Sequence, residues 1–364
     1  MFIGSDKNTS AVLGEQSISE HFNQPDILKL RKDSDNDIRN PQCNRCWEEE
    51  DGGRESKRIR DNKKWNGQTG LVFVELNLGN QCNIRCRTCG PHASSQWIEE
   101  AYDTKYKHVV PIKEYKTLVK KFSRSYEEDS PFWDDIETHL HTIKHLEFYG
   151  GEPLMSKKMW WILERAVELG YSHNIEIHYA TNGTLWPKQV EIWKKFKKVS
   201  LSFSIDGIGP QFEYMRHLAD WDTVHKNVIT STTFSANMQL NWCVTLSTLN
   251  IYYLDEIIKE YYKNYEPKGV TLYLNLVHNP QHFNIGILPE HIKQIVLEKL
   301  NAIPKEHTLA WSYLTGVIGF ITNGTPDKKE WDIFLKELKI HDDYRNESYN
   351  ETFPEFAKLI GYEK

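Results

Sequence analysis

Short apolar runs separated by amphipathic segments predict six β-strands in the middle of the chain. The runs occur at 71–78, 145–150, 175–181, 199–206, 238–246 and 270–277. Between them, apolar residues recur with helical spacing, as at 157–170 and 254–265, which predicts helices on the connections. Strands that alternate with helices in this way indicate βαβ units and a parallel sheet.

Six such strands suit an open barrel better than a closed eight-stranded one. We therefore expect an α/β fold built as a partial (β/α)6 TIM-type barrel over residues 67–285. Residues 1–66 are polar and predict a small irregular region that contains cysteines, with one helix at 17–33. From 286 to 364 the pattern is helical, and we expect this C-terminal extension to cover the open side of the barrel.

Composition and charge exclude several classes of protein. The chain has 364 residues, of which 39% are hydrophobic and 26% charged, with a net charge of −6 and no strongly basic arm or face. Nucleic-acid binding through phosphate neutralisation is therefore not expected. No stretch approaches the ~18 apolar residues of a membrane span, and the N-terminus lacks the pattern of a signal peptide. We expect no membrane association and a cytoplasmic location, where thiols stay reduced.

The six cysteines are unevenly placed. Cys43 and Cys46 form one close pair, and Cys82, Cys86 and Cys89 form a second cluster in "CNIRCRTC". Reduced clusters of this kind usually bind metal. The remaining residue, Cys243, is interpreted as a small buried strand residue.

Polar and glycine-containing segments follow the predicted strands. The second cysteine cluster follows the first strand, "GGEP" (150–153) the second and "TNGT" (181–184) the third, while Ser204 and Asp206 end the fourth. Because ligands gather at the carboxyl ends of parallel strands, we expect these segments to meet at one rim. Two successive glycines also let backbone approach a ligand closely.

Three thiolates on one loop leave two chemistries open. Cysteine thiolates are the standard ligands of iron–sulfur clusters, and a cube held by three of them leaves one iron free. A structural zinc site would instead need a fourth protein ligand, from Cys43, Cys46 or a histidine. The spacing favours iron–sulfur, with zinc as the alternative.

The C-x3-C-x2-C form of "CNIRCRTC" and the segment "YGGEP" after the second strand resemble the radical S-adenosylmethionine (radical SAM) superfamily over roughly 70–280. The resemblance implies that Cys82, Cys86 and Cys89 hold a [4Fe–4S] cluster. It also implies that the free iron binds S-adenosylmethionine, which is cleaved to methionine and a 5′-deoxyadenosyl radical. A flavodoxin- or ferredoxin-like protein would supply the electron.

The resemblance further implies a set of residues around S-adenosylmethionine. Gly150, Gly151 and Glu152 would face its amino group, and Ser204 a ribose or carboxylate oxygen. The remaining expected cofactor contacts are Asn182, Asp206 and Arg216.

Cys43 and Cys46 resemble the C-x2-C segment that precedes the core in twitch- or SPASM-like radical SAM proteins. There, additional upstream cysteines complete an auxiliary cluster. This sequence has none upstream, so we expect an incomplete auxiliary region. Two cysteines do not supply the usual four ligands, and a second cluster is therefore doubtful. The pair would otherwise bind zinc or no metal.

These observations predict a radical SAM enzyme that abstracts hydrogen from a substrate, with a peptide or protein favoured because relatives with such extensions often modify peptides. A carbohydrate or nucleoside substrate is the alternative within this class. A zinc-binding structural or scaffold protein is the alternative from another class.

Overall fold

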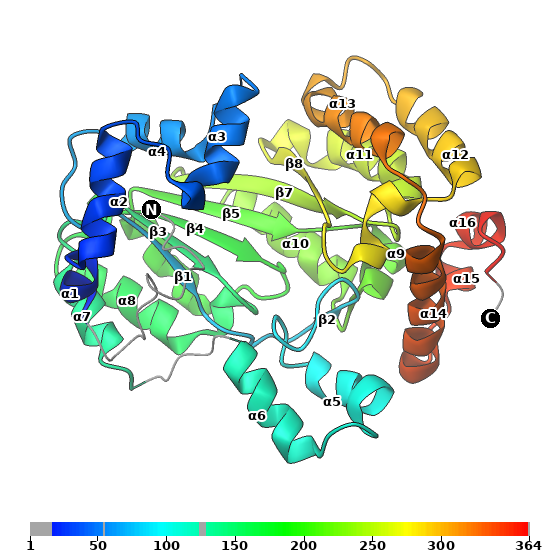
Figure 1. Cartoon of the computed structure of the whole chain (residues 1–364), viewed down its shortest axis with the longest axis horizontal. Helices are drawn as coiled ribbons and strands as arrows, with labels where there is room; N and C mark the ends of the chain where they lie inside the picture. Colours follow the sequence, from blue (N-terminus) through cyan, green and yellow to red (C-terminus); the bar gives the residue numbers. More distant parts are fainter. Residues whose placement is uncertain (1–16, 54, 124–128, 363–364) are drawn as a thin grey trace. The chain divides into compact units, whose positions relative to one another are not determined.

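The computed structural model describes residues 17–53, 55–123 and 129–362. Its main element is a six-stranded sheet with the order β1-β3-β4-β5-β7-β8 (Figure 1). The strands of this sheet are β1 (Phe73–Asn77), β3 (His145–Tyr149), β4 (Glu176–Thr181), β5 (Lys198–Ser204), β7 (Met238–Leu246) and β8 (Thr271–Leu276).

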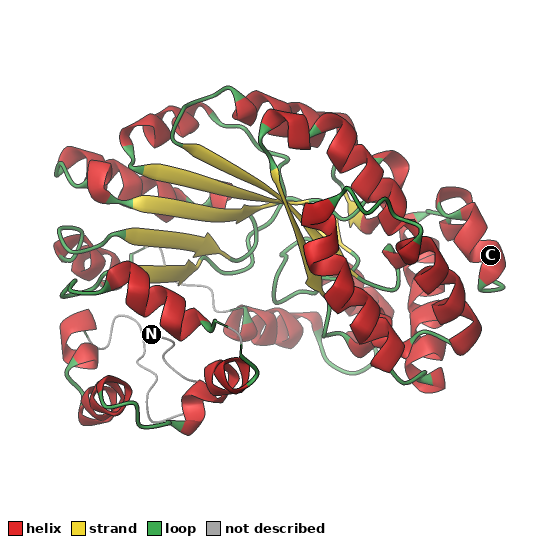
Figure 2. Cartoon of the chain, turned by 90° about the horizontal axis from the view of Figure 1, so that it is seen from above, coloured by secondary structure: helices red, strands yellow, loops and turns green. Residues whose placement is uncertain are grey.

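All six strands predicted from the apolar runs are present. The pairs β4–β5, β5–β7 and β7–β8 are parallel, and Figure 2 shows the strands side by side. The sheet order has two ends, β1 and β8. The predicted fold class, an open and mostly parallel α/β architecture, is therefore confirmed.

Helices occupy the connections and the C-terminal part of the chain. None in the described ranges has both the length and the apolar character needed to cross a bilayer. The α-helices are α1 (Ile18–Phe22), α2 (Pro25–Asp35), α3 (Asn44–Asp51), α4 (Lys57–Trp65), α5 (Trp97–Ala101), α6 (Ile112–Phe122), α7 (Phe132–Thr138), α8 (Lys157–Glu168), α9 (Gly209–Met215), α10 (Trp221–Thr232), α11 (Leu254–Asn264), α12 (Glu290–Asn301), α13 (Thr308–Asn323), α14 (Lys328–Arg345), α15 (Tyr349–Thr352) and α16 (Pro354–Leu359).

The prediction of one helix at 17–33 was wrong, because two helices, α1 and α2, occupy this segment. Pro25 is the first residue of α2. Proline has no backbone N–H to continue a helix, but it suits the first helical position. A two-residue pairing was also missed: β2 (Arg85–Cys86) lies antiparallel to β6 (Arg216–His217).

The chain divides into two compact units. One contains the described residues of Met1–Val74, Tyr126–Leu146 and Trp161–Ile175; the other contains those of Glu75–Ser125, Glu147–Trp160 and Glu176–Lys364. The cysteine cluster, the strand ends and the C-terminal helices all belong to the second unit.

The two faces of the sheet differ in burial. Alternate residues of each strand are buried, as in β7, where Trp242 and Val244 are fully enclosed. Trp242 packs against Tyr261 of α11 and against Tyr265, the residue directly after that helix, with ring centroids 6.1 and 4.3 Å away. This apolar face forms the core, and such aromatic contacts stabilise it beyond simple area burial.

Cys243 lies on the other face of the sheet. In β7 the residues of this face, Asn241, Cys243 and Thr245, are only half-buried. Cys243 is therefore a strand residue, as interpreted from the sequence, but it is half-buried rather than buried. The apolar run 238–246 does not reveal this, because the core contacts come from its alternate residues Leu240, Trp242, Val244 and Leu246.

Candidate iron–sulfur site

The cysteine loop directly follows β1 and is shaped by its pairing with β6. Cys82 and Cys86 are buried, whereas Cys89 is exposed. In the β2–β6 pair, Cys86 stands opposite Arg216. This pairing fixes the backbone of Cys86 against a segment 130 residues later in the chain.

The guanidinium of Arg216 lies beside the thiols. Its Nη1 donates to Cys86 Sγ at 3.5 Å. A hydrogen bond between the Cys86 and Cys89 side chains, together with burial, raises the pKa of Cys86. The same hydrogen bond lowers the pKa of Cys89. The charge of Arg216 favours the thiolate form of both residues. Because thiolates rather than thiols bind metal, Arg216 would make Cys86 and Cys89 better metal ligands.

The Gly150–Gly151 turn approaches the cysteine loop so closely that side chains do not fit. A Cβ on Gly151 would overlap the carbonyl of Gln81, and one on Gly150 would overlap Asn77 and lie 2.6 Å from the Gly79 oxygen. Both glycines have positive φ, +87° at Gly150 and +50° at Gly151. The physical reason for these glycines is thus packing against the loop that carries the cysteines.

The Glu152 side chain points into the protein and accepts hydrogen bonds from the end of β4 and from its own turn. Its carboxylate accepts hydrogen bonds from Thr181 Oγ1 at 2.8 Å, from the Asn182 N–H at 2.7 Å and from the Leu154 N–H at 3.2 Å. The side chain is almost fully buried, and burial raises its pKa to about 7. Glu152 therefore positions the segment after β4.

Asn182 and Asp206 connect the strand ends to the cysteine loop. Asn182 Nδ2 donates to Asn83 Oδ1 at 2.9 Å and lies 3.8 Å from Cys82 Sγ. Asp206 pairs with Arg216 Nη2 at 2.7 Å and accepts from the Thr245 N–H at 2.8 Å. The rim expected from the strand list is thus assembled within the second unit.

The other expected site residues are placed differently. Ser204 ends β5 opposite Cys243 and is half-buried. Cys43 and Cys46 lie where a short 3-10 helix leads into α3, in the first unit, and both are half-buried. Burial and the neighbouring Cys46 raise the pKa of the Cys43 thiol.

The three thiols of the loop at Cys82, Cys86 and Cys89 are the donors available for a metal site. Within residues 17–53, 55–123 and 129–362, no three His, Cys, Asp or Glu side chains are arranged for a metal ion. The donor set is nevertheless three thiols of one loop beside a buried guanidinium, and such donors suit iron–sulfur ligation.

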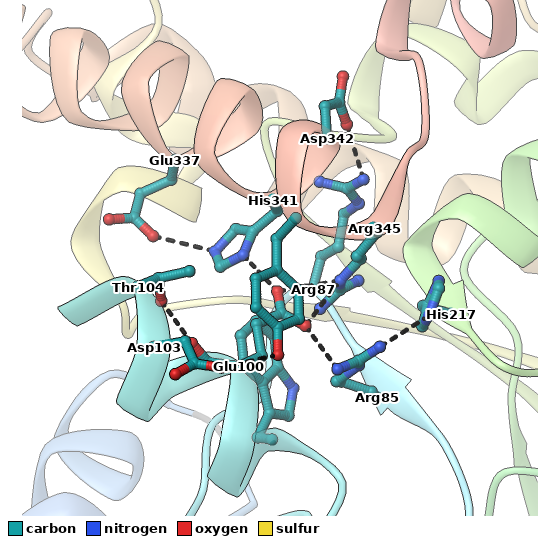
Figure 3. A network of polar contacts seen from close by, with 12 residues as sticks. Arg85, Arg87, Glu100, Asp103, Thr104, His217, Glu337, His341, Asp342 and Arg345 are labelled. Atoms are coloured by element: carbon teal, nitrogen blue, oxygen red, sulfur yellow. Dashed lines mark hydrogen bonds and ion pairs between the residues drawn. The ribbon is translucent and has the colours of Figure 1, made fainter. Parts of the chain in front are cut away.

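A polar network, drawn in Figure 3, surrounds the arginines of the cysteine loop. Arg87, between Cys86 and Cys89, pairs with Asp342 of α14 at 2.8 Å and with Glu347 at 2.5 Å. Arg85 pairs with Glu100 of α5 at 3.0 Å. Sequence reasoning missed these residues, and the interleaving of Arg with Cys in "CNIRCRTC" was the only signal.

Glu100 should make the network sensitive to acid. Burial opposes its charge, but His341 and Arg345 outweigh this and hold its pKa at about 2. A depressed carboxyl pKa stabilises the fold above the unfolded value of 4.5 and loses this contribution as pH falls through about 2. Between pH 5 and 2 the loss should approach about 3 kcal/mol. Denaturant titrations at several pH values should show a shallower acid dependence for Glu100→Gln; an unchanged slope would contradict this assignment.

Three cysteines follow the first strand of this open α/β sheet, beside glycine and carboxylate segments from later strands, and such a donor set would suit an iron–sulfur cluster. Residues 76–229 match the family model described as the radical SAM superfamily. For these residues, the match confirms the resemblance to the radical SAM superfamily predicted from the motifs. The match also supports the prediction of an enzyme.

Relatives are distant. The chain is 24% identical over 162 residues to GTP 3′,8-cyclase of Haemophilus influenzae (strain PittEE), a match that covers 44% of this chain and 41% of that protein. Among solved structures, native anSMEcpe with bound AdoMet is 16% identical, with a TM-score of 0.42 over 64% of this chain and 60% of that chain. Streptococcus suis SuiB bound to S-adenosylmethionine is 14% identical, with a TM-score of 0.40 over 62% and 45%.

Proposed function

We propose that the chain is a radical SAM enzyme in which Cys82, Cys86 and Cys89 hold a [4Fe–4S] cluster. The observation that carries this is the convergence, within one unit, of the cysteine loop with the ends of three strands. Arg216 touches Cys86, and Asn182 lies beside Cys82. When bound, the cluster and S-adenosylmethionine would supply one-electron cleavage to a 5′-deoxyadenosyl radical that takes a hydrogen atom from the substrate.

Residues of this chain would order the site in three ways. Arg216 would favour the ionised thiols while remaining paired with Asp206. Glu152 would hold Asn182 in place through its backbone N–H. The backbone of Gly150 and Gly151 and the side chain of Ser204 would complete the cofactor rim. A flavodoxin- or ferredoxin-like protein would deliver the electron, and Cys43 and Cys46 are assigned no second cluster.

Polar side chains on the half-buried face of the sheet support the proposal of a polar substrate. Glu147 of β3 lies 3.4 Å from His178 Nδ1 of β4 and accepts from the Tyr149 hydroxyl at 3.0 Å. The His178 Nε2 lies 2.9 Å from Ser202 Oγ, to which Asn241 Nδ2 donates at 3.2 Å. These side chains form a polar row across four neighbouring strands.

We propose a peptide or protein substrate whose basic or hydrogen-bonding side chain meets this row. Within the second unit, the strand residues on this half-buried face include three carboxylates, Glu75, Glu147 and Glu176, and one ammonium group, that of Lys198. A negative face favours cationic groups by charge complementarity. A nucleoside or carbohydrate is the second candidate, favoured by the similarity to GTP 3′,8-cyclase.

The test is anaerobic reconstitution followed by reduction with dithionite in the presence of S-adenosylmethionine. Formation of 5′-deoxyadenosine, stimulated by lysine- and arginine-containing peptide pools more than by GTP, is the expected result. Stimulation by GTP alone would move the assignment to the second candidate. Iron-loaded protein that forms no 5′-deoxyadenosine would overturn the proposed activity.

Glu147→Gln should separate substrate recognition from cofactor cleavage. Loss of one charged hydrogen-bond partner should lower peptide-stimulated turnover about tenfold, with substrate-free cleavage unchanged. Glu176→Gln is the matched control, because Glu176 pairs with Lys197 at the opposite end of the strands. Equal effects of the two substitutions would remove the row from the substrate site.

A further inference from the structure

The cysteine loop carries a buried arginine whose acidic partners come from the C-terminal extension. The Arg87 side chain is 1% exposed and lies against the Tyr214 ring, with its guanidinium carbon 3.5 Å from the centroid. Its Nε donates to the Tyr214 carbonyl at 3.1 Å. Its charge is balanced by Asp342 and Glu347, 255 and 260 residues further along the chain.

An unpaired guanidinium at this depth would be strongly unfavourable. Arg87 can therefore occupy its place only while α14 and the segment after it are docked. Asp342 is itself held by the Tyr214 hydroxyl at 2.6 Å and by the Tyr349 N–H at 2.8 Å. The conformation of the loop between Cys86 and Cys89 thus depends on residues that lie outside the domain match at 76–229.

Glu347 also reaches the strand that faces Cys86. Its carboxylate lies 2.6 Å from His217 Nδ1, and His217 Nε2 lies 2.9 Å from Arg85 Nη2. In the β2–β6 pair, Arg85 stands opposite His217. A single carboxylate therefore ties together both arginines that flank Cys86 and the strand that carries Arg216.

A second connection runs through α5. Glu100 accepts from Arg85 and from Arg345 of α14, each at 3.0 Å, and lies 2.6 Å from His341 Nδ1 (Figure 3). The α14 helix is thus linked to the cysteine loop on both sides of Cys86. This exceeds what a covering helix alone would require.

We propose that Arg87 and Glu347 are positioning residues for the iron–sulfur ligands, and that α14 with the segment after it clamps the cysteine loop. The inference rests on the proposed function in that it concerns the same cluster. Neither residue acts on a substrate; they hold Cys86 and Cys89 where a cluster can be assembled and retained. Partners of metal ligands commonly influence metal affinity in this way.

The experiment compares Glu347→Gln with Glu351→Gln after anaerobic reconstitution. Glu347 lines a surface hollow of about 860 Å³, and its side chain is 21% exposed, so the substituted amide can be solvated and the fold retained. Glu351 lines the same hollow and is exposed. We expect Glu347→Gln to lose iron to a chelator about tenfold faster than wild type, with Glu351→Gln unchanged. Glu347→Asp, which keeps the charge, should recover part of the retention.

Three readouts separate the outcomes. The metal-free Glu347→Gln and Glu351→Gln proteins should both unfold cooperatively, with the midpoint of Glu347→Gln lowered only modestly because Asp342 still pairs with Arg87, so that iron loss from the folded protein reports on the site. The double variant Arg87→Gln/Glu347→Gln should lose iron no faster than either single variant, because the two residues act through each other. Wild-type retention in Glu347→Gln would overturn the clamp while leaving the proposed function intact. A wild-type protein that binds no iron and sulfide would instead overturn the proposed function.

Discussion

Replacing Cys82, Cys86 and Cys89 together by alanine is expected to remove all iron and sulfide, from about four of each per reconstituted chain. Reductive cleavage of S-adenosylmethionine should fall below detection in the same variant. The physical reason is that thiolates of this loop are the proposed ligands, and Arg216 stabilises the charge of Cys86 and Cys89. Anaerobic iron and sulfide analysis beside the visible spectrum is the measurement.

Two control variants make this result specific. Cys243→Ala should retain iron and sulfide, because Cys243 lies on β7 and burial raises its pKa to about 11, which disfavours the thiolate. Replacing Cys43 and Cys46 together by alanine should also leave the iron content unaltered. About eight irons in wild type, reduced to about four by that change, would establish a second cluster. Zinc without sulfide would identify a structural metal protein instead.

Gly151→Ala is expected to destabilise the protein by about 3 kcal/mol and to displace the cysteine loop. Alanine at this position would be strained at φ +50°, and its Cβ would overlap backbone atoms of Gln81. Backbone atoms cannot move aside as the end of a flexible side chain could. Glu152 would move as well, because its N–H donates to the Gln81 carbonyl at 2.8 Å. The measurement is the free energy of unfolding, followed by iron retention.

Gly209→Ala is the matched control for the strain that alanine incurs at a positive φ. Gly209 has φ +53°, nearly the value of Gly151, but a Cβ there would meet nothing within 4 Å. It should cost only about 1 kcal/mol, the strain of the conformation alone. Equal losses in the two variants would show that close packing of the glycine turn on the cysteine loop contributes nothing.

The α14 network adds a second role to the covering role expected for the C-terminal extension. The helical pattern after residue 285 predicts the helices, and α12 to α16 confirm it. Part of α14 makes apolar contacts, through the buried side chains of Trp331, Phe334 and Leu338. The contacts of Asp342 and Arg345 are instead ionic and reach the elements next to the cysteines.

The sequence by itself determined those features that depend on neighbouring residues. Apolar runs located all six strands of the main sheet, because burial of one strand face leaves a local pattern. The spacing of Cys82, Cys86 and Cys89 and the Gly-Gly-Glu turn identified the domain, because cluster ligation by one loop requires closely spaced thiols. The order of strands then placed the rim, since parallel strands end at the same edge.

Only the tertiary structure decided which distant charges pair and which face of a strand is buried. No pattern in the sequence predicts that Arg87 pairs with Glu347, because the two residues are 260 positions apart and meet only in the folded chain. The face on which Cys243 lies depended on which neighbours in β7 met the helices. Both outcomes follow from packing between remote segments, where the environment rather than the residue type sets the energy of a charge or a thiol.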